Sequence, residues 1–215
     1  DAVVEVSDRQ LDNAFCAVRP PGHHAERDHA MGFCFFNNIA LAAEFLAREF
    51  GYSRIAIVDF DVHHGNGTQH LFEERPDVLF ISTHQDPRTC YPGTGFAKEQ
   101  GTGQGTGYTV NVPLAPGTED EEYLHHFRTM VLPALEDYQP QFVLVSAGFD
   151  AHRDDPLASL NLTERSYREV SHALVQIAEE HAGGRLVSLL EGGYDLRALS
   201  TSVREHVSVL MGEEA

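Results

Sequence analysis

Residues 55–66, IAIVDFDVHHGN, decide the fold of this 215-residue chain. They begin with an apolar run, residues 55–58, typical of a strand buried on both faces of a parallel sheet. Asp59, Asp61 and His63 follow at every second position, so an extended backbone points all three side chains to one side. A helix cap with a satisfied histidine would explain a lone Asp-x-His, but not the additional carboxylate. Because carboxylate and imidazole suit zinc or a similar divalent ion, the stretch predicts a metal site where the strand ends.

Composition limits the class of partner. The net charge of −18 argues against non-specific binding of DNA or RNA. It would steer basic partners such as Lys-rich peptides, although the same charge can serve solubility alone. No apolar run is long enough to span a bilayer, and no signal peptide is visible, so we expect no membrane association.

The cysteine pattern bears on the cellular compartment, and the length and first residue bear on the domain organisation. Cys16, Cys34 and Cys90 form no C-x-x-C pair, and their odd number fits a reducing compartment, so we expect a cytoplasmic protein. The length suffices for one sizeable core, and we expect one domain over residues 1–215. Because the sequence begins at Asp1 rather than Met, we expect it to be a piece of a longer protein that opens close to a strand.

Strand and helix patterns alternate along the whole chain. Buried apolar runs predict strands at residues 15–18, 55–58, 78–83, 108–114, 142–146 and 185–190. Capping residues and helical periodicity predict helices at about 38–50, 68–75, 120–138 with a break at Pro133, 163–182 and 196–211. This alternation predicts an α/β fold with a mostly parallel sheet and helices on both faces.

Further polar groups gather where predicted strands end. His23 and His24 follow the stiff loop Arg19-Pro-Pro-Gly and are general acid/base candidates. Asp150 ends the strand at 142–146 and is a third metal-ligand candidate. The glycines in residues 85–107 do not follow a strand and open a helix, so we reject a nucleotide-binding loop.

Four motifs carry a resemblance: RPPGHHA at 19–25, DFDVHHGNGT at 59–68, SAGFDAH at 146–152 and EGGYDL at 191–196. With them the chain resembles the histone deacetylases, most closely the class II and bacterial deacetylase-like amidohydrolases. The resemblance implies the three-layer arginase/deacetylase-like fold. It also implies that the amino-terminal part of the family's catalytic domain is missing from this sequence.

The resemblance implies roles for individual residues. Asp61, His63 and Asp150 match the ligands of a zinc ion, for which Fe²⁺ is the alternative. His23 and His24 match the tandem catalytic histidines, with Asp59 and Asn66 as their hydrogen-bond partners, and Tyr194 matches the tyrosine that binds the substrate carbonyl. The substrate-binding positions are Gly32, Phe33, Tyr91, Leu157, Gly192 and Gly193. A structural potassium site would use Asp59, Asp61, His63, Ser82 and Thr83. The implied reaction is hydrolysis of N-acetyl-lysine in a peptide or protein to lysine and acetate.

Two residues bear on how well the implied site would work. Asn66 stands where class I members carry a carboxylate, so a charged His24 is stabilised less and its proton affinity should be lower. Tyr194 is present where one vertebrate subgroup has histidine, which favours a competent enzyme.

Three other functions share part of this pattern. An acetylpolyamine amidohydrolase shares the metal centre, but it needs an acid to hold a distant ammonium; Leu157 offers none at the rim, although Glu99 is a candidate. An arginase-like binuclear site needs further carboxylates, and position 65 is Gly where an Asp-x-His-x-Asp run would continue. A non-catalytic acyl-lysine scaffold is the third alternative, and it predicts no turnover with metal present. We favour the acyl-lysine substrate.

Overall fold

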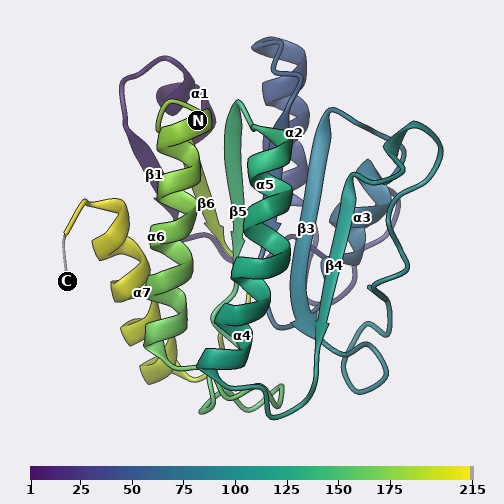
Figure 1. Ribbon diagram of the computed structural model, residues 1–215, viewed down its shortest axis with the longest axis vertical. Coiled ribbons are helices and arrows are strands. Elements are labelled where there is room, and N and C mark those ends of the chain that lie inside the picture. Colours follow the sequence, from purple (N-terminus) through teal and green to yellow (C-terminus); the bar gives the residue numbers. More distant parts are fainter. Residues whose placement is uncertain (214–215) are drawn as a thin grey trace.

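The computed structural model describes residues 1–213. Six parallel strands form one sheet in the order β1-β6-β5-β2-β3-β4 (Figure 1). The strands are β1 Asn13–Cys16, β2 Ile55–Asp59, β3 Val78–Gln85, β4 Thr109–Leu114, β5 Phe142–Ala147 and β6 Leu186–Leu190. The predicted α/β class is confirmed, and the sheet is parallel throughout.

Helices cover both faces of the sheet. The helices are α1 Ala2–Ser7, α2 Asn38–Glu49, α3 Asn66–Phe72, α4 Asp120–His126, α5 Leu132–Tyr138, α6 Glu164–His181 and α7 Leu196–Leu210, with one 3-10 turn at Gly103–Gly105. Helices α4 to α7 lie in front of the sheet in Figure 1, and α1 to α3 lie behind it. Side-chain caps on Asn37, Thr163 and Asp195 fix where α2, α6 and α7 begin.

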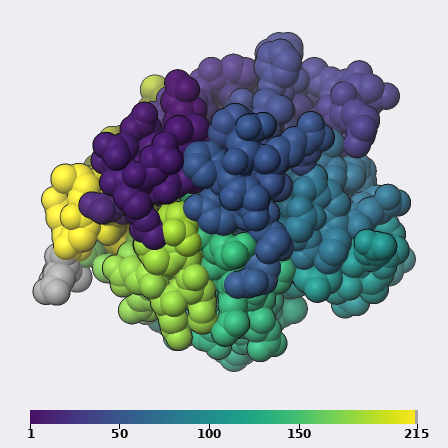
Figure 2. All heavy atoms as spheres, turned by 90° about the horizontal axis from the view of Figure 1, so that it is seen from above, coloured from purple at the N-terminus to yellow at the C-terminus, as the bar shows by residue number. Residues whose placement is uncertain are grey.

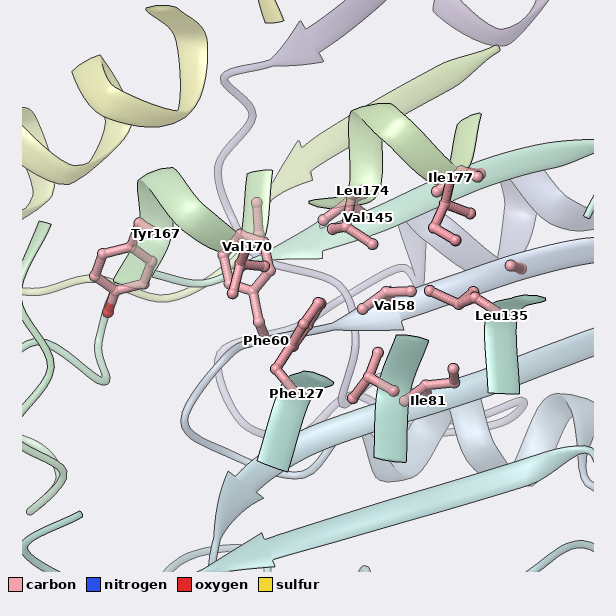
Figure 3. Packing of buried hydrophobic residues seen from close by; sticks show 14 of the residues in the cluster. Val58, Phe60, Ile81, Phe127, Leu135, Val145, Tyr167, Val170, Leu174 and Ile177 are labelled. Atoms are coloured by element: carbon pink, nitrogen blue, oxygen red, sulfur yellow. The ribbon is translucent and has the colours of Figure 1, made fainter. Parts of the chain in front are cut away.

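The central strand shows why a continuous apolar run was the right signal. Ala56 and Val58 pack into the core beneath α4 to α7, whereas Ile55 and Ile57 pack into the core beneath α1 to α3. All four side chains are fully buried. Figure 3 shows Val58 within the first of these cores, which contains aliphatic and aromatic side chains from the sheet and from the covering helices. Burial of each of the three larger side chains, Ile55, Ile57 and Val58, stabilises the fold by about 1.5–3 kcal/mol.

The amino-terminal segment corrects one expectation. The chain opens in helix α1, not close to a strand. The valines favoured the strand interpretation because they are β-branched. Val3 and Val6 are spaced three residues apart, however, and as one helical face they pack into the same core as α2. Figure 2 shows this purple segment beside the blue α2 and near the yellow carboxy-terminal helix.

Several element boundaries differ from the sequence prediction by two or three residues, and two of the differences have a clear physical reason. Strand β1 begins and ends two residues earlier than expected, because its register with β6 runs from Asn13 to Cys16. The predicted break near Pro133 is a π-helical turn, Phe127–Val131, between α4 and α5. Proline has no N–H to donate and crowds the preceding turn, which accounts for a locally wider helix there. Over residues 1–213, no helix is both long and apolar enough to cross a bilayer.

Candidate functional site

The carboxyl ends of four neighbouring strands meet at one edge of the sheet. Asp59 is the last residue of β2, and the register places it beside Ser82 of β3 and Ser146 of β5. Asp61 and His63 follow Asp59, and Asp150 follows β5. The loops after β1 and β6 bring His23, His24 and Tyr194 to the same edge. Parallel strands therefore collect groups that are more than one hundred residues apart in the sequence.

Asp61, His63 and Asp150 form a compact group of three metal-capable side chains. Their ligand atoms all lie within 4.8 Å of one another. His63 Nδ1 is 3.1 Å from Asp61 Oδ1 and 3.1 Å from Asp150 Oδ2. The other oxygen of each carboxylate is held by the backbone, because Gly192 N donates to Asp61 Oδ2 at 2.7 Å and Val62 N donates to Asp150 Oδ1 at 3.0 Å.

This group fits a zinc ion on its chemistry and spacing. Donor atoms bound about 2.1 Å from one tetrahedral zinc lie roughly 3.4 Å apart, close to the distances around His63 Nδ1. Two buried carboxylates and one imidazole are a normal ligand set, and three protein ligands leave one position open. Burial would lower the pKa of His63, but hydrogen bonds to Asp150 and Asp61 raise it well above its ordinary value, so a positive charge is favoured between these carboxylates.

Close backbone approach at this group requires glycine at position 192. A Cβ there would lie 2.1 Å from Asp150 Oδ2 and 2.6 Å from Asp61 Oδ2. Atoms at those distances overlap, so a larger residue would displace both carboxylates. The backbone of the predicted substrate-binding pair Gly192-Gly193 thus also forms a wall of the candidate metal site.

The tandem histidines differ in their partners. His23 Nδ1 is 2.9 Å from the buried carboxylate of Asp59, whereas His24 Nδ1 is 2.7 Å from the side-chain amide oxygen of Asn66. Burial would lower the pKa of His23, but Asp59, Asp61 and Glu191 outweigh it and raise the pKa to about 10. Burial and the neighbouring His23 lower the pKa of His24 to about 3. The two rings, 4.0 Å apart between centroids, are therefore held in different charge states.

A pocket of about 380 Å³ opens above these groups. It is lined by His24, Gly32, Phe33, His63, Tyr91, Leu157 and Tyr194. The Tyr91 ring lies 5.1 Å from that of His24, and the Phe33 ring lies 6.0 Å from that of Tyr194. The structure therefore brings the predicted acid/base, metal and wall residues together around one hollow.

The wall at Gly32 and Phe33 has an unusual backbone. Both residues adopt positive φ, +55° and +66°. A Cβ at Gly32 would lie 2.2 Å from His24 Cδ2, so the loop can pass this ring only with glycine there. A left-handed conformation at a non-glycine residue costs about 1–3 kcal/mol and is concentrated at functional sites. It leaves the Phe33 side chain 68% exposed at the pocket mouth.

Tyr194 is held by two residues that sequence reasoning did not single out. Asp155 Oδ2 accepts a hydrogen bond from Tyr194 N at 2.7 Å. Arg19 Nη2 donates to the carbonyl oxygen of Gly193 at 2.8 Å, and its guanidinium lies 5.7 Å from the Tyr194 ring centre. Burial, Asp61 and Asp150 raise the pKa of Tyr194, so its hydroxyl keeps its proton. The phenol is thus a hydrogen-bond donor at neutral pH.

Glu191 and Glu26 were also missed as parts of the site. Glu191 Oε2 accepts from the backbone N–H groups of Gly22 and His23, at 2.6 and 3.1 Å. Glu26 Oε1 accepts from Asn66 Nδ2 at 2.7 Å. Glu191 opens the EGGYDL motif and Glu26 directly follows the RPPGHHA motif, so position beside a motif was the available signal.

The residues expected at a potassium site lie on β2, on β3 and just after β2. Asp59 pairs with Ser82, and both are fully buried. Ser82 Oγ is 2.9 Å from His84 Nδ1, and Thr83 Oγ1 is 2.9 Å from the Tyr123 hydroxyl. The two side chains are thus each hydrogen-bonded to another protein group.

Larger hollows lie elsewhere on the surface. One of about 660 Å³ lies between residues 26–37 and helices α2 and α3, and one of about 770 Å³ lies against Tyr108 and Tyr138. Neither contains a metal-capable group of three among residues 1–213. Functional sites are marked by convergent polar groups with perturbed pKa values, so the smaller pocket is the better candidate.

Comparisons with known proteins agree with this geometry. The family described as "Histone deacetylase domain" matches residues 1–210. A protein of Arabidopsis thaliana named "Histone deacetylase 14, chloroplastic" is 45% identical over 217 residues, which is 100% of this chain and 51% of that protein. A "Histone deacetylase-like amidohydrolase" of Pseudomonas aeruginosa is 49% identical over 186 residues, 86% of this chain and 48% of that protein.

A solved structure described as the HDA15 HD domain has a TM-score of 0.94 and 45% identity, covering 99% of this chain and 60% of that one. The chain therefore spans about half the length of the curated relatives it matches. The expected cytoplasmic location stays a prediction, since one relative's name places that protein in the chloroplast.

Proposed function

Because this chain belongs to the histone deacetylase family, we propose that it is the site-bearing part of a metal-dependent amidohydrolase that removes acetyl groups from lysine side chains. The observation that carries the proposal is the placement of three groups around one pocket. These are the Asp61, His63, Asp150 group, the tandem histidines and the Tyr194 hydroxyl.

The tandem histidines would move the protons. The Asp59 carboxylate stabilises a charged imidazolium at His23, whereas the neutral amide of Asn66 does so much less at His24. His24, which lines the pocket, is therefore the base that accepts a proton from the attacking water. The same ring then returns the proton to the departing lysine nitrogen, while the charge on His23 stabilises the negative charge that develops nearby.

Tyr194 would stabilise the oxyanion. Its protonated hydroxyl can donate to the carbonyl oxygen as that oxygen becomes negative. Phe33 and Tyr91 both line the pocket, and their aromatic rings suit the apolar stem of a lysine whose charge the acyl group has removed.

Asp61, His63 and Asp150 would hold the catalytic ion, which we propose to be zinc, with Fe²⁺ compatible with the same ligands. When bound, such an ion polarises a carbonyl group and makes water more acidic. A potassium ion beside Asp59 and Ser82, held mainly by backbone oxygens, is part of the proposal. Its support is the burial of the Asp59 carboxylate, which favours a nearby cation.

The hydrogen bonds of Glu99 favour acyl-lysine over an acetylated polyamine as the substrate. A polyamine site needs an acid at its rim, for which Glu99 was the candidate. The Glu99 carboxylate instead turns inward and accepts hydrogen bonds from the backbone N–H groups of Gly95 and Phe96 and from Gln69. It is therefore occupied with shaping the loop that carries Tyr91, and the rim residue Leu157 brings no charge.

The test is hydrolysis by the metal-replete protein of an acetyl-lysine peptide beside acetylspermidine, with Asp150→Ala and Tyr194→Phe as variants. We expect faster peptide turnover that Asp150→Ala abolishes. Loss of one oxyanion donor costs about 10²–10³ in kcat, so Tyr194→Phe should lose that much while its zinc content is unchanged. Faster polyamine turnover would reassign the substrate, and no turnover of either with zinc bound would contradict the proposed activity.

A further inference from the structure

Glu26 is linked to His24 through a single intervening side chain. Asn66 Nδ2 donates to Glu26 Oε1 at 2.7 Å, and Asn66 Oδ1 is 2.7 Å from His24 Nδ1. Asn66 is 3% exposed, and the Glu26 side chain is 12% exposed. Glu26, Asn66 and His24 therefore form a short, mostly buried chain of hydrogen bonds that ends at the proposed acid/base residue.

Helix α3 sets the geometry of this link. Asn66 and His70 are four residues apart, so they share one face of the helix. His70 Nδ1 is 2.7 Å from the same Oε1 atom of Glu26. Since a carboxylate only accepts, both helix residues must donate to it. Met31 Sδ, 3.4 Å from Asn66 Nδ2, is a second and weaker acceptor on the same side.

The acceptor at Glu26 determines which way the Asn66 amide faces. An asparagine amide has a donating end and an accepting end, and only the hydrogen-bond network decides between its two orientations. With the NH₂ group directed to Glu26, the carbonyl oxygen faces His24. His24 Nδ1 must then carry the proton, and its Nε2 keeps the lone pair that a general base needs.

We propose that Glu26 is a positioning residue for His24: its carboxylate fixes the Asn66 amide and thereby holds the His24 imidazole in the tautomer with a proton on Nδ1 and a free Nε2. This inference rests on the proposed function, in which His24 is the base. A hydrogen bond to a charged group biases two such orientations by roughly 10- to 150-fold.

The decisive experiment replaces the hydrogen-bond acceptor at position 26 by a hydrogen-bond donor. Glu26→Lys replaces a pure acceptor by a pure donor, so Asn66 should turn its oxygen outward and its NH₂ group toward His24. The proton of His24 then moves to Nε2, and kcat for the acetyl-lysine peptide should fall by at least about 30-fold with KM within about threefold. Glu26→Gln keeps an accepting oxygen and should stay within about threefold of the unmodified protein. The exposed residue Glu74, changed to Lys, controls for the change in net charge.

A second substitution tests the orientation directly. Asn66→Asp provides accepting oxygens on both sides and needs no orientation. In combination with Glu26→Lys it should therefore raise kcat by at least about tenfold over Glu26→Lys alone. A merely structural role for Glu26 would give additive losses instead. The ¹⁵N signals of His24 report its tautomer without any turnover, and we expect protonated Nδ1 in the unmodified protein and protonated Nε2 in Glu26→Lys.

The results separate the two proposals. If no acyl substrate is turned over, the proposed function fails, and the His24 ¹⁵N signals still decide the role of Glu26. An unchanged tautomer in Glu26→Lys, or a double variant no more active than Glu26→Lys, would overturn the positioning role.

Discussion

Replacing Glu191 by alanine should misplace the tandem histidines. The carboxylate is 1% exposed and joins two strand ends that are distant in the sequence. Its Oε2 accepts from Gly22 N and His23 N, and its Oε1 accepts from Ser146 Oγ at 3.0 Å. The loop that carries His23 and His24 is thus attached to the end of β6 through this side chain.

Two free-energy terms of opposite sign set the effect on stability. Alanine leaves three buried donors, the N–H groups of Gly22 and His23 and the Ser146 hydroxyl, without their acceptor, at about 1–3 kcal/mol each, or about 3–9 kcal/mol together. Burial, together with the nearby Asp59 and Asp61, raises the pKa of Glu191 from 4.5 to about 7 even though His23 lowers it. That rise corresponds to roughly 3 kcal/mol of unfavourable burial for the ionised form above pH 7, which alanine removes. The free energy of unfolding should therefore fall by no more than about 6 kcal/mol.

Catalysis should also suffer, because the loop that carries the histidines loses its anchor. A shift of about 1 Å at a catalytic group can cost about 100-fold in rate, so we expect that loss in kcat for Glu191→Ala. Glu191→Gln keeps an oxygen for the two amides, and its NH₂ can face the Ser146 hydroxyl, so its kcat should stay within about tenfold.

The assay combines turnover of the acetyl-lysine peptide with amide hydrogen exchange. Exchange at Gly22 and His23 should be slow in the unmodified protein and in Glu191→Gln, and fast in Glu191→Ala. Urea unfolding measures the stability term, and zinc content shows whether the metal ligands are disturbed. Glu191→Ala with protected amides and unchanged kcat would refute the anchoring argument.

Three further predictions address the metal group, the glycine wall and the core. Chelation should lower the melting temperature of the zinc-loaded protein, since a ligand present at 1,000 times its Kd stabilises a protein by about 4 kcal/mol. Chelation should not change the melting temperature of Asp150→Ala. Equal melting curves with and without chelator would count against a bound ion. Gly192→Ala should abolish zinc binding measured by calorimetry because its Cβ would overlap Asp150 Oδ2, whereas Gly117→Ala strains the backbone at φ +88° but places no atom near the metal group, so it should bind zinc normally. Burial lowers the pKa of His206 from 6.5 to about 4, so the unfolded state takes up a proton first and stability falls as the pH drops from 6.5 to 4, by about 1.4 kcal/mol per unit. In urea unfolding at pH 7, 6 and 5, the free energy of unfolding of His206→Gln should fall less steeply with decreasing pH than that of the unmodified protein. An identical slope would contradict the role of His206 in this pH dependence.

The sheet could be predicted from sequence because its strands are buried on both faces. Residues 55–58 are continuous apolar residues for that reason, and the polar groups that end β2 and β5 marked the edge where ligands bind. The prediction that the chain opens close to a strand was wrong because three valines in the six residues of α1 satisfy a strand pattern as well as a helical one. Only the packing of Val3 and Val6 into the core that α2 also covers distinguishes the two.

The candidate site was predictable to the extent that its residues are chemically distinctive. The spacing of Asp59, Asp61 and His63 identifies them as a group. Glu191 and Glu26 could not be identified in this way, since an acid beside a turn or a glycine pair is most often a solvated residue or a cap. Their partners lie 169 and 40 residues away, and only the folded chain brings them together.

The distribution of buried charge explains why this edge of the sheet calls for cations. Asp59, Asp61, Asp150 and Glu191 are each at most 1% exposed. Uncompensated carboxylates are very unfavourable in a protein interior, so positive charge must be supplied from nearby. His23 supplies one charge beside Asp59, and a proton on His63 can supply a second between Asp61 and Asp150. Two imidazolium groups do not balance four carboxylates, and a metal ligand must give up its proton. A divalent ion at the Asp61, His63, Asp150 group would therefore replace one proton by two charges, which makes the ion a component of stability as well as of catalysis.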